Sequence, residues 1–466
     1  MDNSDKVLEK ICKTELENGF YEYTIKSIPV YNYLKRYYRR SRLNQINGNN
    51  CDYGKNVEVS FWAHFKMLFT FNRYEWKSFK QILKLVLSSA HYDNFVFAFM
   101  RKDLFNGVYI DRFTDPLIDY SNIKNSYIIF ERSFNGEHFT PRYHSDKIIF
   151  DDVLWKMAKT RAFFFGPIFK LRYKRALDNI VKKLDICFPD IYHTKSYTSY
   201  FIHFNYVYTK LYYKIFKKLK SKRLIAPSRS DFLQLIPAAK LNNMEVIELQ
   251  HGITYGESMT YSGFRDKLFT PDLFLSFGKL CPSDVYGIDE SRIREIGWAF
   301  SYLFDDQSIK KYGKNEVLVI SEPTVSSQII SSIIELALKN PSVTFYFRPH
   351  PNETLTREQK NMLDGMPNIV FDDNRSSALT TIMKFQNVIG VNSTALYEAL
   401  SFGKKVGNIF MNGLNPLYLQ EEDRDCFWAI YDDRSFKLFL VEPKTLKREK
   451  SIYSKYNPDI VNSIIA

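Results

Sequence analysis

The feature that most constrains the fold is a regular alternation of short apolar strands and helices in the second half of the chain. The strands expected there are 317–320, 343–347, 368–371, 387–391 and 406–410, with helices at 326–339 and 395–402. Strands that are apolar on both faces and alternate with helices of about ten residues or more indicate a parallel sheet covered on both sides. This half therefore predicts a doubly wound α/β domain.

A similar alternation precedes it. The expected strands are 94–99, 126–130, 147–150, 223–226, 245–249, 273–278 and 292–297, with a long basic helix at 197–222 and a helix at 232–241. A charged linker, 305–314, separates the two halves, and 466 residues suit two domains. We therefore predict two Rossmann-like α/β domains facing a cleft. The predicted ranges are a helical accessory segment at 1–90, two Rossmann-like domains at 91–305 and 306–430, and a tail at 431–466 that packs back on the first domain.

The composition favours a well-packed protein of a reducing compartment. Hydrophobic residues make up 45% and aromatic residues 16% of the chain. The five cysteines are scattered and never spaced as CxxC, so neither a disulfide framework nor a zinc site is indicated. The N-terminus has no signal-peptide pattern, and no window reaches the roughly 18 uninterrupted apolar residues of a membrane span. We expect a cytoplasmic protein.

The net charge of +13 favours anionic partners. Basic residues gather beside aromatic ones at 31–40, 169–175 and 211–220, a combination that suits a lipid headgroup layer. The alternative for each stretch is a solvated helix face whose rings pack inward. Three such stretches favour an anionic membrane surface, and we expect a peripheral protein at its inner face. No nucleic-acid-binding signature accompanies the charge, so nucleic acid is not an expected partner.

Two motifs of the first domain follow predicted strands, where ligands bind in doubly wound sheets. Gln250-His251-Gly252 comes after the strand at 245–249, and His251 is a candidate acid, base or phosphate donor. Asp231, expected at the start of the helix at 232–241, is a candidate catalytic carboxylate. A structural hydrogen bond for His251 and a helix-capping role for Asp231 stay open as alternatives.

The motif Arg348-Pro349-His350-Pro351 follows a strand of the second domain. Its two prolines prevent a helix and present His350 rigidly, and the guanidinium two residues away suits a phosphate. A rigid turn without function is the alternative. We predict that Arg348, His350 and Pro351 bind the phosphate of a donor substrate.

Asn392-Ser393-Thr394 precedes a helix on which Glu398 lies one turn further on. Capping the helix needs only one of the three polar residues, whereas a phosphate-binding helix start uses all of them. Ser321, at another strand end, is a further candidate for the donor site, with an ordinary cap as the alternative. GxGxxG, GxxxxGK[ST] and HExxH motifs are absent, and no convincing metal-binding pair appears, so no metal or redox cofactor is expected.

The order of these motifs resembles that of bacterial two-domain (GT-B) glycosyltransferases of capsule and lipopolysaccharide synthesis, particularly those that transfer Kdo or sialic acid from CMP-sugars. In that group a His-Pro motif and a Ser-Thr helix start hold the nucleotide, which implies these roles for His350-Pro351 and Ser393-Thr394. Glu398 and the run 399–404 match the family's "EAL…GK" run. The resemblance covers residues 222–412.

The Gln-His-Gly motif resembles the Trp-His-Gly of CDP-glycerol phosphotransferases, whose His is thought to be a base. The acidic-acidic-Gly motif of bacterial sialyltransferases is missing here, which leaves Asp231 as the carboxylate candidate. The resemblance implies metal-independent transfer of a sugar, an ulosonic acid such as Kdo or sialic acid, from a CMP-linked nucleotide-sugar donor to a bacterial surface glycan on a lipid carrier.

Three alternatives remain. A CDP-polyol phosphotransferase of teichoic-acid type is the nearest enzymatic one. A UDP-sugar 2-epimerase shares the fold but does not need the membrane-facing charge. A non-catalytic scaffold of polysaccharide assembly belongs to a different class.

Overall fold

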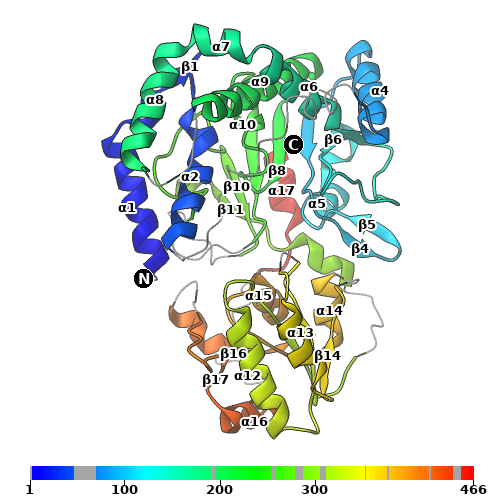
Figure 1. Cartoon of the computed structure of the whole chain (residues 1–466). Coiled ribbons are helices and arrows are strands. Elements are labelled where there is room, and N and C mark those ends of the chain that lie inside the picture. Colours follow the sequence, from blue (N-terminus) through cyan, green and yellow to red (C-terminus); the bar gives the residue numbers. More distant parts are fainter. Residues whose placement is uncertain are drawn as a thin grey trace. The chain divides into compact units, whose positions relative to one another are not determined.

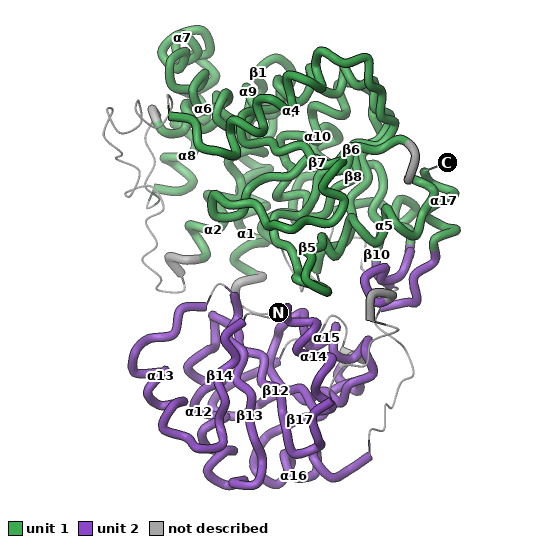
Figure 2. Tube along the Cα trace, turned by 90° about the vertical axis from the view of Figure 1, so that its right-hand side faces the viewer, with its two compact units in different colours: residues 1–276, 281–294, 458–466 green, residues 277–280, 295–457 purple. Residues whose placement is uncertain are grey.

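The structure is a computed structural model that describes residues 3–46, 70–189, 191, 195–252, 258–278, 287–304, 311–351, 353–374, 377–416, 418, 421–443 and 453–465. The chain divides into two compact units (Figure 2). Unit 1 comprises residues 1–276, 281–294 and 458–466, and unit 2 comprises 277–280 and 295–457. Each unit is built around its own sheet.

The sheet of unit 1 is doubly wound. Its strands are β3 (Asn94–Phe97), β6 (Tyr127–Glu131), β7 (Ile148–Phe150), β8 (Arg223–Pro227), β9 (Glu245–Leu249), β10 (Leu273–Ser276) and β11 (Ile293–Glu295). They lie in the order β11-β10-β9-β8-β3-β6-β7, and the pairings from β10 to β7 are parallel. The order runs outward in both directions from β3 and β8, so the topological switch point lies between these two strands.

Helices cover this sheet, and two hairpins extend from the unit (Figure 1). The helices are α1 (Asn3–Glu17), α2 (Tyr31–Ile46), α4 (Arg73–Leu87), α5 (Thr114–Tyr120), α6 (Asp152–Phe164), α7 (Gly166–Arg172), α8 (Lys174–Cys187), α9 (Lys195–Leu219), α10 (Leu235–Lys240) and α17 (Pro458–Ile465). The hairpins are β1 (Thr24–Ile25) with β2 (Ile28–Pro29) and β4 (Asp103–Phe105) with β5 (Val108–Ile110).

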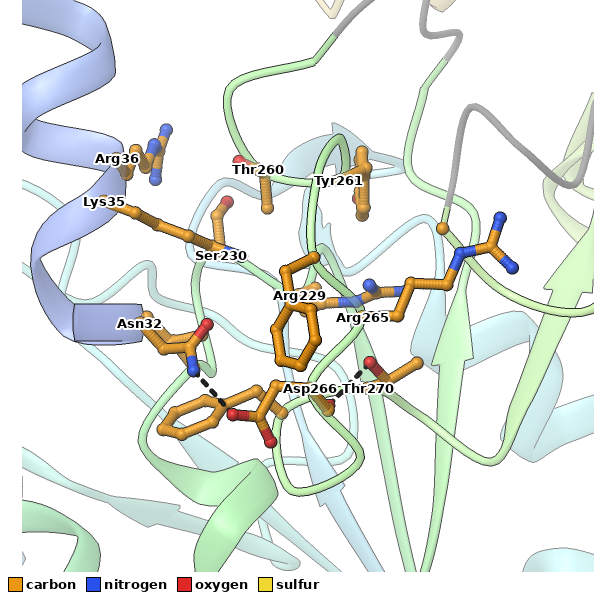
Figure 3. A pocket seen from close by; sticks show the side chains of 14 residues that line it. Asn32, Lys35, Arg36, Arg229, Ser230, Thr260, Tyr261, Arg265, Asp266 and Thr270 are labelled. Carbon is orange, nitrogen blue, oxygen red and sulfur yellow. Dashed lines mark hydrogen bonds between the residues drawn. The ribbon is translucent and has the colours of Figure 1, made fainter. Parts of the chain in front are cut away.

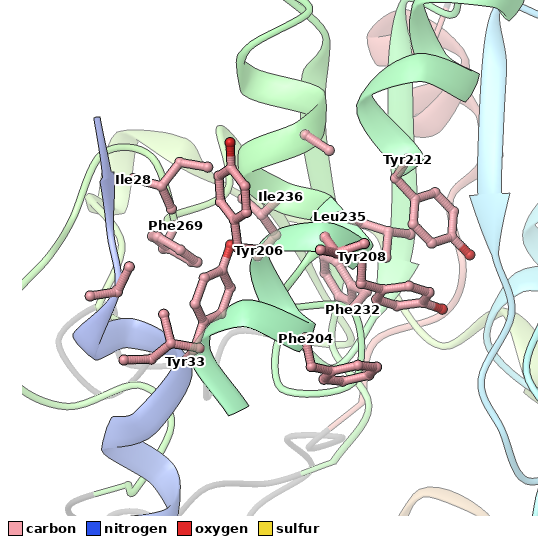
Figure 4. Packing of buried hydrophobic residues seen from close by; sticks show 14 of the residues in the cluster. Ile28, Tyr33, Phe204, Tyr206, Tyr208, Tyr212, Phe232, Leu235, Ile236 and Phe269 are labelled. Carbon is pink, nitrogen blue, oxygen red and sulfur yellow. The ribbon is translucent and has the colours of Figure 1, made fainter. Parts of the chain in front are cut away.

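The core of unit 1 is organised around α9. Tyr208, Tyr212 and Phe216 recur every four residues along this helix, which places them on one face. They are buried with strand residues such as Phe95 and with the α10 region, as Figure 4 shows for Phe232. The aromatic residues of the 211–220 stretch thus pack largely inward. This agrees with the alternative considered for that stretch, a solvated helix face whose rings pack inward.

The N-terminal helices are an integral part of unit 1. The carboxylate of Glu15 in α1 accepts hydrogen bonds from the Arg39 guanidinium of α2 at 2.6 and 2.8 Å, and neither side chain is exposed. Arg39 also donates to the carbonyl oxygen of Ser262 at 2.8 Å. Part of the basic stretch at 31–40 is therefore internal, because Glu15 neutralises Arg39 and the side chains of Tyr31 and Tyr38 are buried, whereas Arg36 and Arg40 are exposed.

The sheet of unit 2 has the order β14-β13-β12-β15-β16-β17, and every pairing in it is parallel. Its strands are β12 (Glu316–Ile320), β13 (Thr344–Arg348), β14 (Ile369–Phe371), β15 (Asn387–Gly390), β16 (Lys405–Ile409) and β17 (Trp428–Ile430). Numbered along the chain, this is the 3-2-1-4-5-6 order of a dinucleotide-binding fold, with its switch point between β12 and β15.

Alternate residues of the central strand β12 pack on opposite faces of the unit 2 sheet. Val317 and Val319 are buried with residues of α12, and Leu318 and Ile320 with residues of α14 and α15. The helices are α12 (Ser326–Lys339), α13 (Arg357–Asp364), α14 (Ala378–Lys384), α15 (Thr394–Ser401) and α16 (Asp433–Val441). A Cβ on Gly390 would lie 2.9 Å from the Ile320 carbonyl oxygen, so the close approach of β15 to β12 requires glycine there.

The predicted fold class, two Rossmann-like doubly wound α/β domains with an added helical N-terminal segment, is confirmed by these two sheets. The predicted domain ranges differ in detail. The units divide at residue 295 rather than 306, and the segment 1–90 belongs to unit 1. The predicted tail 431–466 is split, because α16 packs in unit 2 whereas α17 lies in unit 1, where the Asn462 side chain accepts from the Asn122 amide at 2.7 Å.

Candidate functional site

The loop after β8 lies at the switch point of unit 1. Ser228, directly after the strand, has φ 65 and is buried, a strained backbone of the kind that clusters at functional sites. Asp231 follows in a turn that precedes α10, because this helix begins at Leu235 and not at Phe232. The N-cap of α10 is Gln234, so the capping role considered for Asp231 is wrong. The carboxylate of Asp231 instead accepts from the Ser230 hydroxyl at 3.4 Å.

An ion pair that is almost completely buried joins the ends of β8 and β9. Glu248 lies opposite Ala226 in the sheet and receives the Arg229 guanidinium at 2.9 and 3.0 Å. The same carboxylate accepts from the Arg229 main-chain amide at 2.7 Å and from the Tyr261 hydroxyl at 3.1 Å. These bonds satisfy Glu248 fully, so we assign it the role of holding the two strand-end loops in place.

Gln250 and His251 divide their roles within the turn after β9. Gln250 is buried, and its side-chain amide donates to the Gly252 carbonyl oxygen at 3.1 Å, so it shapes the turn. His251 is partly buried, with its ring centroid 6.1 Å from that of Phe99, which follows β3. Burial lowers the pKa of His251, the charges of Asp231 and Glu248 oppose this, and Arg36 adds to it. A neutral imidazole near Asp231 is suited to accept a proton.

A pocket next to these loops is lined by basic side chains. Lys35 and Arg36 of α2 reach it from one side, and Arg229 and Arg265 from the other (Figure 3). Lys35, Arg36 and Arg265 make no ion pair with any residue in the described ranges. Burial lowers the pKa of Lys35 to about 7, and the neighbouring positive charge of Arg39 contributes.

Asp266 is the carboxylate on the described wall of this pocket, and it is already engaged. It accepts from the Asn32 side-chain amide at 3.0 Å and from the Leu268 main-chain amide at 2.8 Å. The pocket therefore has an excess of positive charge suited to a phosphate or carboxylate. Sequence analysis missed it, because Lys35 and Arg36 are distant in sequence from the motifs.

A buried network supports the switch point from behind. The Arg132 guanidinium donates to the Asp231 carbonyl oxygen at 3.3 Å and to the Tyr208 hydroxyl at 2.9 Å, and it lies 3.5 Å from the Asp151 carboxylate. Asp151 also accepts from Tyr212 at 2.9 Å. Burial raises the pKa of Asp151 although Arg132 opposes the shift. No sequence motif marked this network, since its members come from four separate elements.

In unit 2, three candidate segments follow three adjacent strands, since β13, β12 and β15 are neighbours in the sheet. Glu353, which sequence analysis did not single out, connects two of them. Its carboxylate accepts from the Ser321 hydroxyl at 2.9 Å, from the His350 main-chain amide at 2.8 Å, and from the Ser326 hydroxyl. Ser321 is completely buried, so its hydroxyl serves this connection, which differs from the predicted donor contact.

Arg348 also has an internal partner. Its guanidinium donates to the Asp372 carboxylate at 2.7 Å and to the Thr381 hydroxyl at 2.9 Å, and the residue is 5% exposed. This pair joins the end of β13 to β14 and α14. The Arg348 guanidinium thus contacts a carboxylate inside the unit, which differs from the predicted contact with a phosphate. A buried cation needs a nearby opposite charge, and Asp372 supplies it. Arg348 therefore fixes the strand end from which His350 and Pro351 extend.

The third segment begins α15. Ser393 is the N-cap, and its hydroxyl accepts from the Ala395 amide at 3.3 Å. Asn392 and Thr394 flank it, and all three side chains are partly buried, as is Glu398 one turn further on. The capping role considered for this segment is confirmed for Ser393. Asn392 and Thr394 stay candidates for binding the nucleotide. So does His350, which is partly buried and follows β13, two strands away from β15 in the sheet.

The structure thus brings the candidate residues together in two groups, one at the carboxyl ends of the strands in each unit. Asp231, Gln250, His251 and Gly252 form the unit 1 group, and Ser321, His350, Pro351 and the start of α15 form the unit 2 group. Within the described ranges, no group of three or more His, Cys, Asp or Glu side chains is arranged to hold a metal ion. A single cleft shared by both groups stays a prediction.

Comparisons with known proteins give weak structural similarities alone. No family model and no curated protein matches the chain. UDP-GlcNAc 2-epimerase from Methanocaldococcus jannaschii is 11% identical, with a TM-score of 0.44, over 80% of this chain and 98% of that one. The enzyme of that name from Neisseria meningitidis, bound to UDP-GlcNAc, is 13% identical, with a TM-score of 0.45, over 80% and 97%. TarM is 14% identical, with a TM-score of 0.31, over 50% of each chain. At these levels the similarities carry no argument about activity.

Proposed function

We propose that this chain is a metal-independent glycosyltransferase of the GT-B type, which moves a sugar from a nucleotide-sugar donor to a bacterial surface glycan. The observation that carries the proposal is the convergence of His350 and the α15 N-terminus on the switch-point edge of the unit 2 sheet. A helix N-terminus presents free amide donors and a positive dipole end to an anion, and a neighbouring imidazole adds a further donor. This combination suits a nucleotide phosphate.

The donor follows from the family that the motif order resembles. We propose a CMP-linked ulosonic acid such as Kdo or sialic acid, with His350-Pro351 and Ser393-Thr394 on the nucleotide. The buried pairs of Glu353 and Arg348 hold the strand ends rigid, so little rearrangement is needed when the nucleotide binds. Glu398 lies on the same helix as the phosphate-binding start and is the proposed polar contact beyond it.

The acceptor half of the reaction belongs to unit 1. The acceptor hydroxyl has to lose a proton as it attacks, and His251 is the group best suited to take it, since burial keeps the imidazole neutral near pH 7. Asp231 stabilises the imidazolium that forms, because its charge raises the pKa of His251. The basic pocket of Lys35, Arg36 and Arg265 is suited to an acceptor that carries a phosphate, such as a glycan on a lipid carrier at an anionic membrane surface.

That pocket also favours one second candidate. A CDP-polyol phosphotransferase of teichoic-acid type acts on a chain of polyol phosphates, which this basic pocket would recognise in the same way. The two functions differ in the donor. A CMP-sugar loses CMP as the sugar is transferred, whereas a CDP-polyol loses CMP as the polyol phosphate is transferred.

Calorimetric titration of the full chain with CMP, CDP and UDP tests the proposal. We expect CMP to bind and the His350→Ala variant to weaken its binding about tenfold, which is the loss of one hydrogen bond to a charged group. His91→Ala removes an exposed histidine of unit 1 and serves as the control. Binding of UDP alone contradicts the CMP-linked donor. Preferential binding of CDP favours the polyol phosphotransferase. If no nucleotide binds, the non-catalytic scaffold is the remaining hypothesis.

A further inference from the structure

A surface of unit 1 remote from the strand-end loops combines exposed apolar side chains with basic ones that have no ion-pair partner in the described part of the chain. It is centred on α7, which connects α6 to α8 and packs across α9. One side of α7 is firmly attached. Phe169 is buried, and its ring stacks on His203 of α9 at 4.0 Å between centroids with an interplanar angle of 8°.

The other side of α7 and the residues just before it face solvent. Phe164 and Phe165 are 43% and 51% exposed, Ile168 is 63% exposed and Leu171 is 76% exposed. Single exposed apolar residues are common on protein surfaces, but four large ones within eight positions form a patch. Because Phe169 fixes the opposite face, these side chains cannot turn inward without detaching the helix.

A pocket of about 400 Å³ opens beside this patch, with Phe165 and Ile168 at its apolar side. Its basic residues come from four places in the chain: Lys26 from the β1–β2 turn, Arg161 from α6, Arg172 from α7, and Lys210 and Lys214 from α9. None of the five has an ion-pair partner among the residues that the structure describes, and none of the described lining residues is acidic.

We infer that the α7 surface, defined as Phe164, Phe165, Ile168 and Leu171 with this basic pocket, docks on an anionic phospholipid bilayer. The apolar side chains enter the interfacial layer, and the pocket binds a lipid phosphate. A hydrophobic patch with a ring of Lys and Arg matches the two layers that such a bilayer presents, acyl chains beneath phosphates. Nucleic acid or free phosphate would contact the cations alone, so neither explains the exposed apolar patch.

A second group of exposed apolar side chains lies on α4. Trp76, Phe79, Leu83 and Val86 are spaced by three and four residues and are 52%, 41%, 46% and 44% exposed. Lys77, Lys80 and Lys84 alternate with them. α4 packs on α6, which leads directly into α7, and Figure 1 shows the three helices at the same end of unit 1. Both helices thus offer the same chemistry to one bilayer.

This inference names the membrane contact that the proposed function requires, and it changes which residues make it. Of the stretch at 31–40, Arg39 is paired with Glu15 inside the unit, and Lys35 and Arg36 line the other basic pocket, beside the strand-end loops. Of the stretch at 211–220, Lys214 lines the pocket whereas Tyr212 and Phe216 are buried. No helix in the described part of the chain is long and apolar enough to cross a membrane.

Sedimentation of the full chain with lipid vesicles tests the inference. We expect binding to vesicles of phosphatidylcholine mixed with phosphatidylglycerol, much weaker binding to phosphatidylcholine alone, and release by salt. The double variant Ile168→Glu with Leu171→Glu should weaken vesicle binding at least about tenfold. The double variant Lys210→Glu with Lys214→Glu should do the same, because each basic residue near the surface contributes about a factor of five to the affinity.

Matched controls are Leu338→Glu and Lys360→Glu in unit 2, which alter one apolar residue that is 68% exposed and one exposed lysine. All variants change surface positions, and unaltered circular dichroism and thermal unfolding show that they fold. Equal vesicle binding by the variants and their controls overturns the inference, and so does the absence of binding to anionic vesicles. Release by inorganic phosphate at unchanged ionic strength points to a free-anion site and likewise overturns it.

The vesicle assay needs no nucleotide, so it separates this inference from the proposed function. Vesicle binding without nucleotide binding leaves the membrane surface standing and removes the glycosyltransferase proposal. Nucleotide binding without vesicle binding does the reverse. A single-stranded oligonucleotide that competes for the cation pocket but is insensitive to Ile168→Glu with Leu171→Glu identifies a nucleic-acid site, which contradicts the bilayer.

Discussion

The strand-end edges of the two units share a topology but differ in how their charges are neutralised. In unit 2, Glu353 and Asp372 bind the groups next to His350, namely Ser321, Ser326 and Arg348. In unit 1, Glu248 neutralises Arg229, whereas Lys35, Arg36 and Arg265 have no ion-pair partner in the described ranges. Unit 2 is therefore a preorganised frame around one imidazole and one helix end. Unit 1 holds an excess of positive charge beside a histidine whose pKa is shifted.

The largest expected effect follows from the difference in burial of the two internal pairs. Glu248→Ala leaves Arg229 buried without a counter-charge and should cost unit 1 about 3–5 kcal/mol. Asp372→Ala should cost unit 2 about 1–3 kcal/mol, because the Asp372 side chain is 15% exposed and water can reach Arg348. Hydrogen exchange of the β8–β9 peptides and of the β12–β13 peptides measures the loss of stability in each unit separately. Equal losses would show that the pairs do not differ in burial as described.

The second effect concerns the frame of unit 2. Glu353→Ala removes the acceptor for Ser321, Ser326 and the His350 amide, so the strand-end turn should loosen and CMP should bind about tenfold more weakly. Glu353→Gln keeps one acceptor oxygen and should restore part of the affinity. Glu358→Ala, at an exposed position of α13, is the control. An unchanged affinity in Glu353→Ala would mean that the turn does not depend on this carboxylate.

The smallest effect is electrostatic and lies in unit 1. His251 should titrate below the ordinary value of 6.5, chiefly because burial disfavours its charged form. Asp231→Asn removes a charge that raises the pKa and should lower it further, whereas Arg36→Ala removes a charge that lowers the pKa and should raise it. An NMR titration of the histidine side chains measures both shifts.

Asp266→Asn is the matched control for this titration, because that carboxylate is hydrogen-bonded to Asn32 and is not among the groups that shift His251. If activity depends on neutral His251, it should persist below pH 6.5 and fall only as the pH drops through the lowered pKa. A pKa of His251 that rises in Asp231→Asn would mean that the two groups are not arranged as described.

Most strands of the two sheets, the doubly wound class and the position of the motifs at strand ends were predicted from the sequence, whereas β17 and the short hairpin strands were not. The run 317–320 is apolar on both faces, and a strand of that kind is stable only inside a covered parallel sheet, so local pattern and tertiary environment agree. The helix that begins at Ser393-Thr394 was equally legible, because its N-cap is encoded by adjacent residues.

The tertiary structure alone decided which charges are free. Arg348 and Arg39 look like the exposed basic residues of a binding motif, but Asp372 and Glu15 neutralise them inside the units. Lys210 and Lys214 look like ordinary helix-surface residues, yet they line a pocket whose described lining has no acidic residue. The identity of a side chain fixes its charge, whereas the distance to the nearest opposite charge depends on how remote segments pack, and only the fold sets that distance.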